Sequence, residues 1–220
     1  MSEMNVEQAR FNMVEQQIRT WEVLDPRVLD TLQHMPREHF VPDHLRNLAF
    51  SDMNLPLGHG EVMLSPKQEG RLLQAAELSP SEQVLEVGTG SAYLTACLAR
   101  MSAHVTSIDI YQEFLDVAGD RLKREAIRNV ALKCGDAAAG WDDGKRYDAI
   151  IVGGGLPELH KGFHYSLTVG GRLVVMVGEA PIMEGMLITR VGEAQWATES
   201  LFDTWLPPLV NAPRTRRFDF

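Results

Sequence analysis

The chain has 220 residues, a hydrophobic content of 45% and a formal net charge of -9. This length and apolar content suit one globular domain, alone or with an attached subdomain. Because phosphate binding usually requires a concentrated basic surface, the charge argues against nucleic acid as a partner. The first residues are polar and the apolar runs are short, so we expect neither a signal peptide nor a membrane-spanning segment.

The cysteines and the C-terminal arginines are expected to have no special role. Cys97 and Cys134 both lie in apolar segments, and two cysteines suggest neither a disulfide framework nor a metal site. We therefore expect a reducing, cytoplasmic location and no bound metal. Arg214, Arg216 and Arg217 form a small basic cluster, which is interpreted as a solvated tail.

The N-terminal region, residues 1–64, is predicted to be a cap of helices and loops. An early short helix contains Ile18. A second helix begins at Asp25, a favoured N-cap residue that is followed by proline, and it ends at Pro36. The stretches FVPDHL and NLPLGHG come next, and their prolines predict irregular structure. We expect this cap to pack on an α/β domain at residues 65–220, in one structural unit.

From residue 83 the pattern changes to apolar strands that alternate with amphipathic helices. The predicted strands are QVLEV (83–87), HVTSIDI (104–110), NVALKCGD (129–136), YDAIIVGGG (147–155) and GGRLVVMVG (170–178). MLITRV and the segment around residues 195–205 are predicted to close the sheet as an antiparallel pair. This order predicts a doubly wound, mostly parallel α/β sheet that is covered by helices on both faces.

The first of these strands runs into a glycine turn at Gly88 and Gly90. Glycines allow the chain to turn tightly and bring backbone amides close to a ligand. In such sheets, ligands bind beyond the carboxyl ends of the strands. The next strand ends in Asp109, about 20 residues further on, which is the usual distance for an acid that binds a ribose. Together these features predict a nucleoside-binding site.

The residues around this turn favour S-adenosylmethionine over a dinucleotide. Tyr93 stands where the dinucleotide motif has its third glycine, which allows close packing of helix and strand. Glu86 would repel a pyrophosphate, whereas its carboxylate suits the ammonium group of an amino acid. Asp136 follows the third strand, where it could accept a hydrogen bond from an adenine amino group.

The sequence resembles the protein-L-isoaspartate O-methyltransferases, which use S-adenosylmethionine to methylate the abnormal carboxylate of isoaspartyl residues in damaged proteins. The resemblance covers most of the chain, and its N-terminal part is the specific one, because methyltransferases in general share the glycine turn. It is carried by MVEQQIR (13–19), VLDTLQHMPREHFVP (28–42), LPLGHG (55–60), VLEVGTGSAYLTACLA (84–99), NVALKCGD (129–136), YDAIIV (147–152) and GGRLVVMVG (170–178).

The resemblance implies a Rossmann-like methyltransferase whose partner is a protein or peptide bearing a carboxylate. It implies that S-adenosylmethionine is bound by residues at the ends of three strands, namely Glu86, Gly88, Thr89, Gly90, Ser91, Asp109, Ile110, Gly135 and Asp136. Within that set, Asp109 would bind the ribose and Asp136 would lie near the adenine. The substrate side would be formed by His59, Val62, Leu64, Gly153 and Gly154.

Two departures from the family pattern fall on the substrate side. Leu64 stands where the family usually has a serine beside the transferring methyl group, and Gly153–Gly155 replace a threonine followed by alanines. Three interpretations follow from them. The chain retains the repair activity, it methylates another acceptor, with His59 as a base for such an acceptor, or it binds the cofactor without catalysis. The sequence leaves the acceptor and the oligomeric state open.

Ser65, the next residue, has two possible roles. With Pro66 and Gln68 after it, Ser65 fits the N-cap of a helix with a capping box, and this is the favoured interpretation. A shift of the loop by one residue would instead bring the hydroxyl of Ser65 inward as a catalytic group. Methylation of a carboxylate does not require a base, because the carboxylate is already ionised at neutral pH.

Overall fold

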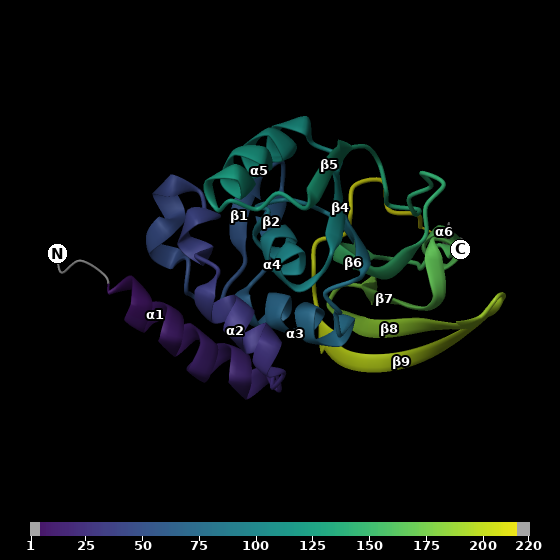
Figure 1. Ribbon diagram of the computed structural model, residues 1–220, viewed down its shortest axis with the longest axis horizontal. Coiled ribbons are helices and arrows are strands. Elements are labelled where there is room, and N and C mark those ends of the chain that lie inside the picture. Colours follow the sequence, from purple (N-terminus) through teal and green to yellow (C-terminus); the bar gives the residue numbers. More distant parts are fainter. Residues whose placement is uncertain (1–4, 215–220) are drawn as a thin grey trace, which may run out of the picture.

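A seven-stranded sheet forms the centre of the computed structural model, which describes residues 5–214 (Figure 1). Its parallel strands are β3 (Gln83–Val87), β4 (His104–Asp109), β5 (Val130–Cys134), β6 (Tyr147–Leu156) and β7 (Leu167–Glu179). Two antiparallel strands, β8 (Ile182–Gly192) and β9 (Gln195–Thr204), extend it at one edge. The predicted sheet and its closing antiparallel pair are therefore confirmed.

The strand order is β5-β4-β3-β6-β7-β8-β9. The chain moves outward from β3 to β5 on one side and from β6 to β9 on the other, so the direction of winding reverses between β3 and β6. In doubly wound sheets, ligands bind in the crevice at this reversal, beyond the carboxyl ends of the strands. The fold therefore places the end of β3, and the glycine turn after it, at the expected binding position.

Side chains of the central strands alternate between two apolar layers, one on each face of the sheet. Val84 of β3 belongs to the layer that also contains residues of the N-terminal region, whereas Leu85 belongs to the other layer. The first layer is covered by α3 (Pro66–Ala76), α4 (Tyr93–Met101) and α5 (Gln112–Arg124). The short helix α6 (Lys161–Tyr165) contributes the buried Phe163 to the second layer.

The N-terminal helices lie at the opposite end of the molecule from α6 (Figure 1). Helix α1 (Val6–Met13) continues through a π-helical turn at Val14–Ile18, and α2 (Pro26–His34) begins where the side chain of Asp25 accepts a hydrogen bond from the Arg27 N–H. Both predicted helices are confirmed. Apolar residues of these helices share one core with the sheet, so the proposed boundary after residue 64 separates parts of one structural unit.

The prediction of irregular structure was wrong for NLPLGHG. Its residues form strand β1 (Leu55–Gly58) and the turn that leads to β2 (Glu61–Met63), which pairs with β1 as an antiparallel hairpin. Positive φ angles of 114° at Gly58, 55° at His59 and 83° at Gly60 close the turn. The first three residues of FVPDHL follow a 3-10 helix at Arg37–His39, and its last three begin a second 3-10 helix at Asp43–Leu48. The hairpin was not predicted because proline, here Pro56, usually interrupts a strand. An edge strand nevertheless tolerates proline, and both strands of a two-stranded hairpin are edges.

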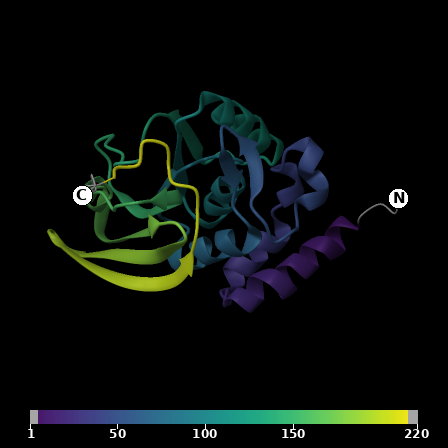
Figure 2. The ribbon, with the colours of Figure 1, turned by 180° about the vertical axis from the view of Figure 1, so that it is seen from behind.

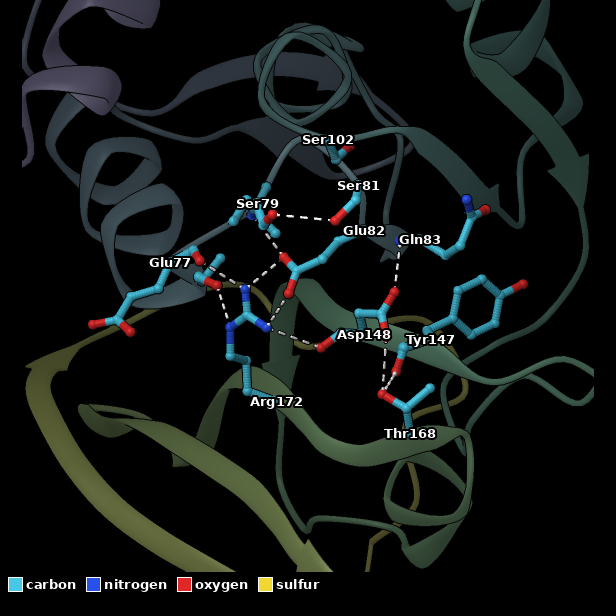
Figure 3. Close-up of polar contacts among 12 residues, drawn as sticks. Glu77, Ser79, Ser81, Glu82, Gln83, Ser102, Tyr147, Asp148, Thr168 and Arg172 are labelled. Atoms are coloured by element: carbon cyan, nitrogen blue, oxygen red, sulfur yellow. Dashed lines mark hydrogen bonds and ion pairs between the residues drawn. The ribbon is translucent and has the colours of Figure 1, made fainter.

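A polar network ties α3 to the amino ends of the strands, at the end of the sheet opposite the glycine turn (Figure 3). The guanidinium of Arg172 donates to both carboxylate oxygens of Glu82, at 2.8 and 2.7 Å, and to the carbonyl of Glu77 at 2.8 Å. Burial would raise the pKa of Glu82, but the hydrogen bonds from Arg172 and Ser79 outweigh it and lower that pKa. Asp148 accepts from the Gln83 N–H and the Thr168 hydroxyl.

Four expectations from the sequence concern the cysteines, the C-terminal arginines, membrane-spanning helices and metal ligands. Cys97 and Cys134 are both free. Arg214 is exposed, whereas the other two arginines of the predicted tail, Arg216 and Arg217, lie outside the described residues. Between residues 5 and 214, no helix combines the length and the apolar character that crossing a bilayer requires. No cluster of three potential metal ligands is found within the same range.

Candidate active site

A pocket lies at the carboxyl ends of β3, β4 and β6, where the strand order reverses. It contains about 660 Å³ of empty space, part of which is open to solvent. Its walls come from the hairpin, the strand ends, the start of α5 and a segment near the C-terminus. The lining residues are Leu57, Glu61, Val62, Val87, Gly88, Gly90, Ile108, Asp109, Ile110, Tyr111, Phe114, Gly135, Asp136, Ala137, Ala138, Gly153, Gly154, Pro207, Leu209 and Val210.

The glycine turn forms the floor of this pocket. Gly88 and Gly90 adopt φ angles of 95° and 47°, which favour glycine. A Cβ atom on Gly90 would lie 3.1 Å from the side chain of Leu57, and one on Gly88 would lie 3.8 Å from the Cα of Gly153. The missing side chain of Gly90 therefore lets the hairpin approach the turn closely, and both glycines leave the backbone of the turn open to a ligand.

Asp109 stands at the wall beside this turn. Its Oδ2 accepts a hydrogen bond from the Gly90 N–H at 2.9 Å, and its Oδ1 accepts one from the Tyr111 N–H at 3.0 Å. Burial raises the pKa of Asp109, while these backbone donors oppose the rise. Two N–H bonds leave free lone pairs on the carboxylate. The side chain is therefore held in one orientation and can still accept from a pair of ligand hydroxyls.

Glu86 is not among the residues that line the pocket, and the contact of its carboxylate with a ligand's ammonium group stays a prediction. Its side chain is fully buried, and its Oε2 accepts from the hydroxyls of Thr95 at 2.5 Å and Ser107 at 2.6 Å. Burial raises the pKa of Glu86 to about 8. Strand side chains alternate between faces, so Glu86 points to the side of α4, whereas its neighbour Val87 faces the pocket.

Two other predicted cofactor residues also lie behind the pocket wall. The hydroxyl of Thr89 is 2.6 Å from that of Ser107, which extends the network around Glu86. The hydroxyl of Ser91 accepts from the Tyr93 N–H at 3.2 Å, near the start of α4. Both side chains therefore stabilise the turn through internal hydrogen bonds. Neither Thr89 nor Ser91 is among the residues that line the pocket.

The third strand end brings its predicted residues into the pocket. Gly135 donates its N–H to the carbonyl of Asp109 at 2.9 Å, which joins the two strand ends. Asp136 lines the pocket, but each of its carboxylate oxygens already accepts a hydrogen bond, one from the Ala138 N–H at 3.0 Å and one from the Asn211 amide at 2.9 Å. Ile110 adds an apolar surface between Asp109 and Tyr111.

The structure places Leu64 and Ser65 outside the lining of the pocket. Leu64 is buried, and its carbonyl accepts a hydrogen bond from Arg37 at 2.6 Å. Ser65 is the N-cap of α3, and its N–H and hydroxyl both donate to the side chain of Gln68 at 3.1 Å. The favoured interpretation of Ser65 as a helix cap is confirmed. Val62, two residues before Leu64, does line the pocket.

His59 lies at the tip of the hairpin, at the rim of the pocket. Its Nε2 is 2.9 Å from a carboxylate oxygen of Glu113, and its ring stacks on Tyr111 with a centroid distance of 4.2 Å. Tyr111 and Phe114 belong to the pocket wall. His59 thus fastens the hairpin to the start of α5, and its side chain is not among the residues that face the pocket.

The glycines at 153–155 make room for a segment that follows β9, residues 206–212, which we call the C-terminal segment. Gly155 donates to the carbonyl of Pro207 at 2.8 Å and accepts from the Leu209 N–H at 2.9 Å. A Cβ atom on Gly154 would lie 2.5 Å from Leu209. Figure 2 shows this segment, in yellow, crossing over the strands. The glycine departure from the family pattern therefore accompanies close packing of the C-terminal segment.

Several pocket residues were not predicted from the sequence. Tyr111 and Phe114 follow Asp109 at the start of α5, so their proximity to the predicted ribose-binding acid was an available signal. Glu61 directly follows the LPLGHG stretch, and no pattern around it in the sequence indicates that it lines a pocket. The residues of the C-terminal segment carry no local signal, because only the tertiary fold brings them to the end of β6.

The chain matches known proteins over nearly its whole length. The family model for protein-L-isoaspartate(D-aspartate) O-methyltransferase matches residues 8–212. A protein-L-isoaspartate O-methyltransferase 1 from Rhodopseudomonas palustris (strain HaA2) is 38% identical over 202 residues, which are 91% of this chain and 82% of the relative. A protein-L-isoaspartate O-methyltransferase 2 from Pelobacter propionicus is 36% identical over 209 residues, covering 94% and 93% of the two chains.

Solved structures agree in fold. A Plasmodium falciparum protein assigned to the same enzyme class, in complex with S-adenosyl-L-homocysteine, superposes with a TM-score of 0.79 and 21% identity, covering 94% of this chain and 99% of the other. The Rossmann-like methyltransferase fold is thereby confirmed. From the family match and the identity to its curated members, this chain belongs to the protein-L-isoaspartate(D-aspartate) O-methyltransferase family.

Proposed function

We propose that this protein transfers a methyl group from S-adenosylmethionine to the carboxylate of isoaspartyl residues in damaged proteins or peptides. As a member of the family it is a methyltransferase, and S-adenosylmethionine is the cofactor of that family. The observation that carries the proposal is the hydrogen bond between Asp109 and Gly90, at 2.9 Å, on the floor of a pocket at the reversal of strand order.

The pocket residues fit this cofactor. The open backbone at Gly88 and Gly90 suits its amino-acid end, and the oriented carboxylate of Asp109 suits its ribose hydroxyls. Ile108, Ile110 and Ala137 offer apolar surface for a purine ring. We therefore propose a cofactor set of Gly88, Gly90, Asp109, Ile110, Gly135 and Asp136. When bound, S-adenosylmethionine supplies a methyl group on a positively charged sulfur.

The acceptor side of the pocket has to position a carboxylate and exclude water. We propose that Val62, Gly153 and Gly154 form this side together with Pro207 and Leu209. A carboxylate with a pKa of about 4 arrives ionised at neutral pH, so no residue has to remove a proton. Proximity and alignment then supply the rate enhancement, and the apolar wall limits competition from water.

The test is transfer of labelled methyl from S-adenosylmethionine to an isoaspartyl peptide, compared with the same peptide carrying a normal aspartate. We expect label in the isoaspartyl peptide alone, as a base-labile ester. Binding of S-adenosylmethionine is measured by calorimetry in the same buffer. Binding without transfer to either peptide would overturn the isoaspartyl assignment and leave the methyltransferase fold and cofactor site intact.

A different methyl acceptor is the second candidate function. It is favoured by the buried leucine at position 64, where the family usually carries a serine hydroxyl, and by the apolar wall that the C-terminal segment provides. Such an acceptor would be revealed by label in another small molecule or protein after the isoaspartyl peptide fails. We also propose that the protein is located in the reducing cytoplasm, which agrees with its two free cysteines.

Replacing Ser65 with alanine separates the two roles that the sequence allows for its hydroxyl. Because this side chain bonds to Gln68 at the start of α3, we expect Ser65→Ala to lower the free energy of unfolding by about 1 kcal/mol. Methyl transfer should keep the wild-type kcat, since Ser65 does not line the pocket. Urea unfolding and the peptide assay measure the two effects. A large fall in kcat with unchanged stability would show that Ser65 acts on the substrate.

A further inference from the structure

The pocket carries negative charge without a balancing cation. Three of its lining residues are acidic, namely Glu61, Asp109 and Asp136, and none of the described residues that line it is lysine, arginine or histidine. Asp109 and Asp136 have hydrogen-bond donors from the backbone or from Asn211. Glu61, in contrast, has no such donor among the described residues.

Glu61 begins β2, on the hairpin that forms one wall, and its side chain is partly buried there. Within residues 5–214, its carboxylate takes no hydrogen bond or ion pair. His59, two residues earlier, is a potential cation, but its Nε2 contacts Glu113 of α5. Burial and then the charge of Asp109 raise the pKa of Glu61, whereas His59 acts in the opposite direction. Glu61 is thus an unpaired carboxylate that lines the same pocket as Asp109.

We propose that Glu61 makes the cofactor site select by charge, so that it holds S-adenosylmethionine and releases S-adenosylhomocysteine. This inference rests on the proposed function. When the S–CH₃ bond breaks and an O–CH₃ bond forms, the sulfonium becomes a neutral thioether and the acceptor carboxylate becomes a neutral ester. The cofactor thus loses the positive charge that offsets Glu61. Repulsion between Glu61 and Asp109 then returns, and it favours release of the product.

The same arrangement couples binding to protons. A bound cation stabilises the ionised form of Glu61 and so lowers its raised pKa, whereas a neutral thioether does not. Binding of S-adenosylmethionine should therefore release protons at a pH close to that pKa and become tighter as the pH rises through it. Asp109 at the end of β4 also titrates here, so its contribution has to be separated from that of Glu61 by substitution.

The experiment compares Kd values for S-adenosylmethionine and S-adenosylhomocysteine, measured by calorimetry on the wild-type chain and on Glu61→Gln. The ratio of the Kd for the product to that for the cofactor should fall about fivefold in the variant, as expected for one charge pair screened by water. Sinefungin, whose amine places a positive charge near the position of the sulfonium, should follow S-adenosylmethionine. Glu199→Gln on exposed β9 removes the same charge far from the pocket and should leave the ratio unchanged.

A second measurement needs only the wild-type protein and protects the test from a variant that folds poorly. Calorimetry in two buffers of different ionisation enthalpy, repeated at several pH values above the ordinary pKa of glutamate, should detect proton release with S-adenosylmethionine and none with S-adenosylhomocysteine. Binding of both ligands with an unchanged ratio in Glu61→Gln, or equal proton release with both, overturns the inference while the proposed function stands. Failure of the wild type to bind either ligand removes the proposed function and this inference with it.

Discussion

Replacing Arg37 with leucine should destabilise the protein by about 3–5 kcal/mol at a pH where Glu69 is ionised in the wild type, the cost of leaving one member of a buried ion pair without its partner. The Arg37 side chain is fully buried and pairs with the carboxylate of Glu69, which is 1% exposed. It also donates to the carbonyls of Ala49 at 2.8 Å and Leu64 at 2.6 Å. One side chain thus holds the N-terminal region, the end of the hairpin and α3 together, and urea unfolding measures its contribution.

The pH dependence of this loss identifies Glu69 as its source. Burial raises the pKa of Glu69 to about 8, and the charge of Arg37 opposes the rise. Without Arg37 the pKa of Glu69 in the folded state should rise further. In the variant, Glu69 therefore keeps its proton at pH values where Glu69 of the wild type loses it. A folded state that binds more protons than the unfolded state loses stability as the pH increases. The difference between Arg37→Leu and wild type should therefore widen above about pH 8.

Two further variants control for this prediction. Adding Glu69→Leu to Arg37→Leu removes the unpaired carboxylate, and the double variant should recover part of the lost stability. Arg46→Leu removes an arginine whose partner, Asp43, is 92% exposed, and it should change the free energy of unfolding by less than about 0.5 kcal/mol. If Arg37→Leu lowered the free energy of unfolding no more than Arg46→Leu does, the ion pair would not be what holds the N-terminal region, the hairpin and α3 together.

The sheet and one side of the pocket were predictable because their signals are local. An apolar strand, a glycine turn and an acid at the end of the next strand occur within 30 residues of sequence, and the structure joins them through the bond from Gly90 to Asp109. The orientation of Glu86 follows from a pattern that the sequence also contained. Side chains alternate along a strand, so Glu86 and the pocket-lining Val87 had to face opposite sides of β3.

The other side of the pocket depends on contacts between distant segments. The hairpin, the glycines at the end of β6 and the C-terminal segment meet there, and no local period predicts that Gly155 would pair with Pro207 and Leu209. Glu61 illustrates the same limit. An isolated glutamate in a sequence most often lies on a solvated surface. Only the folded hairpin reveals that this one lines the same pocket as Asp109.

Replacing Asp109 with alanine should weaken binding of S-adenosylmethionine by at least about 100-fold, since each hydrogen bond to a charged group contributes about 1.5–3 kcal/mol and two ribose hydroxyls are available. Asp109→Asn keeps the shape and one acceptor oxygen, so its loss should be smaller. Because Asp109 also accepts the Gly90 and Tyr111 N–H groups, part of the effect comes from the turn. Calorimetric titration gives the Kd, and thermal unfolding reports whether the turn still folds.

The nature of the lost contact is tested with 5′-methylthioadenosine, which keeps the adenine and ribose and lacks the amino-acid end of the cofactor. If Asp109 binds the ribose, Asp109→Ala should weaken methylthioadenosine by the same factor as S-adenosylmethionine. Glu61→Gln, in contrast, should leave binding of this neutral nucleoside unchanged. Loss of S-adenosylmethionine binding with intact methylthioadenosine binding would instead move Asp109 to the amino-acid end. Asp109 and Glu61 would then both bind the positively charged end of the cofactor, and Asp109 would not contact the ribose.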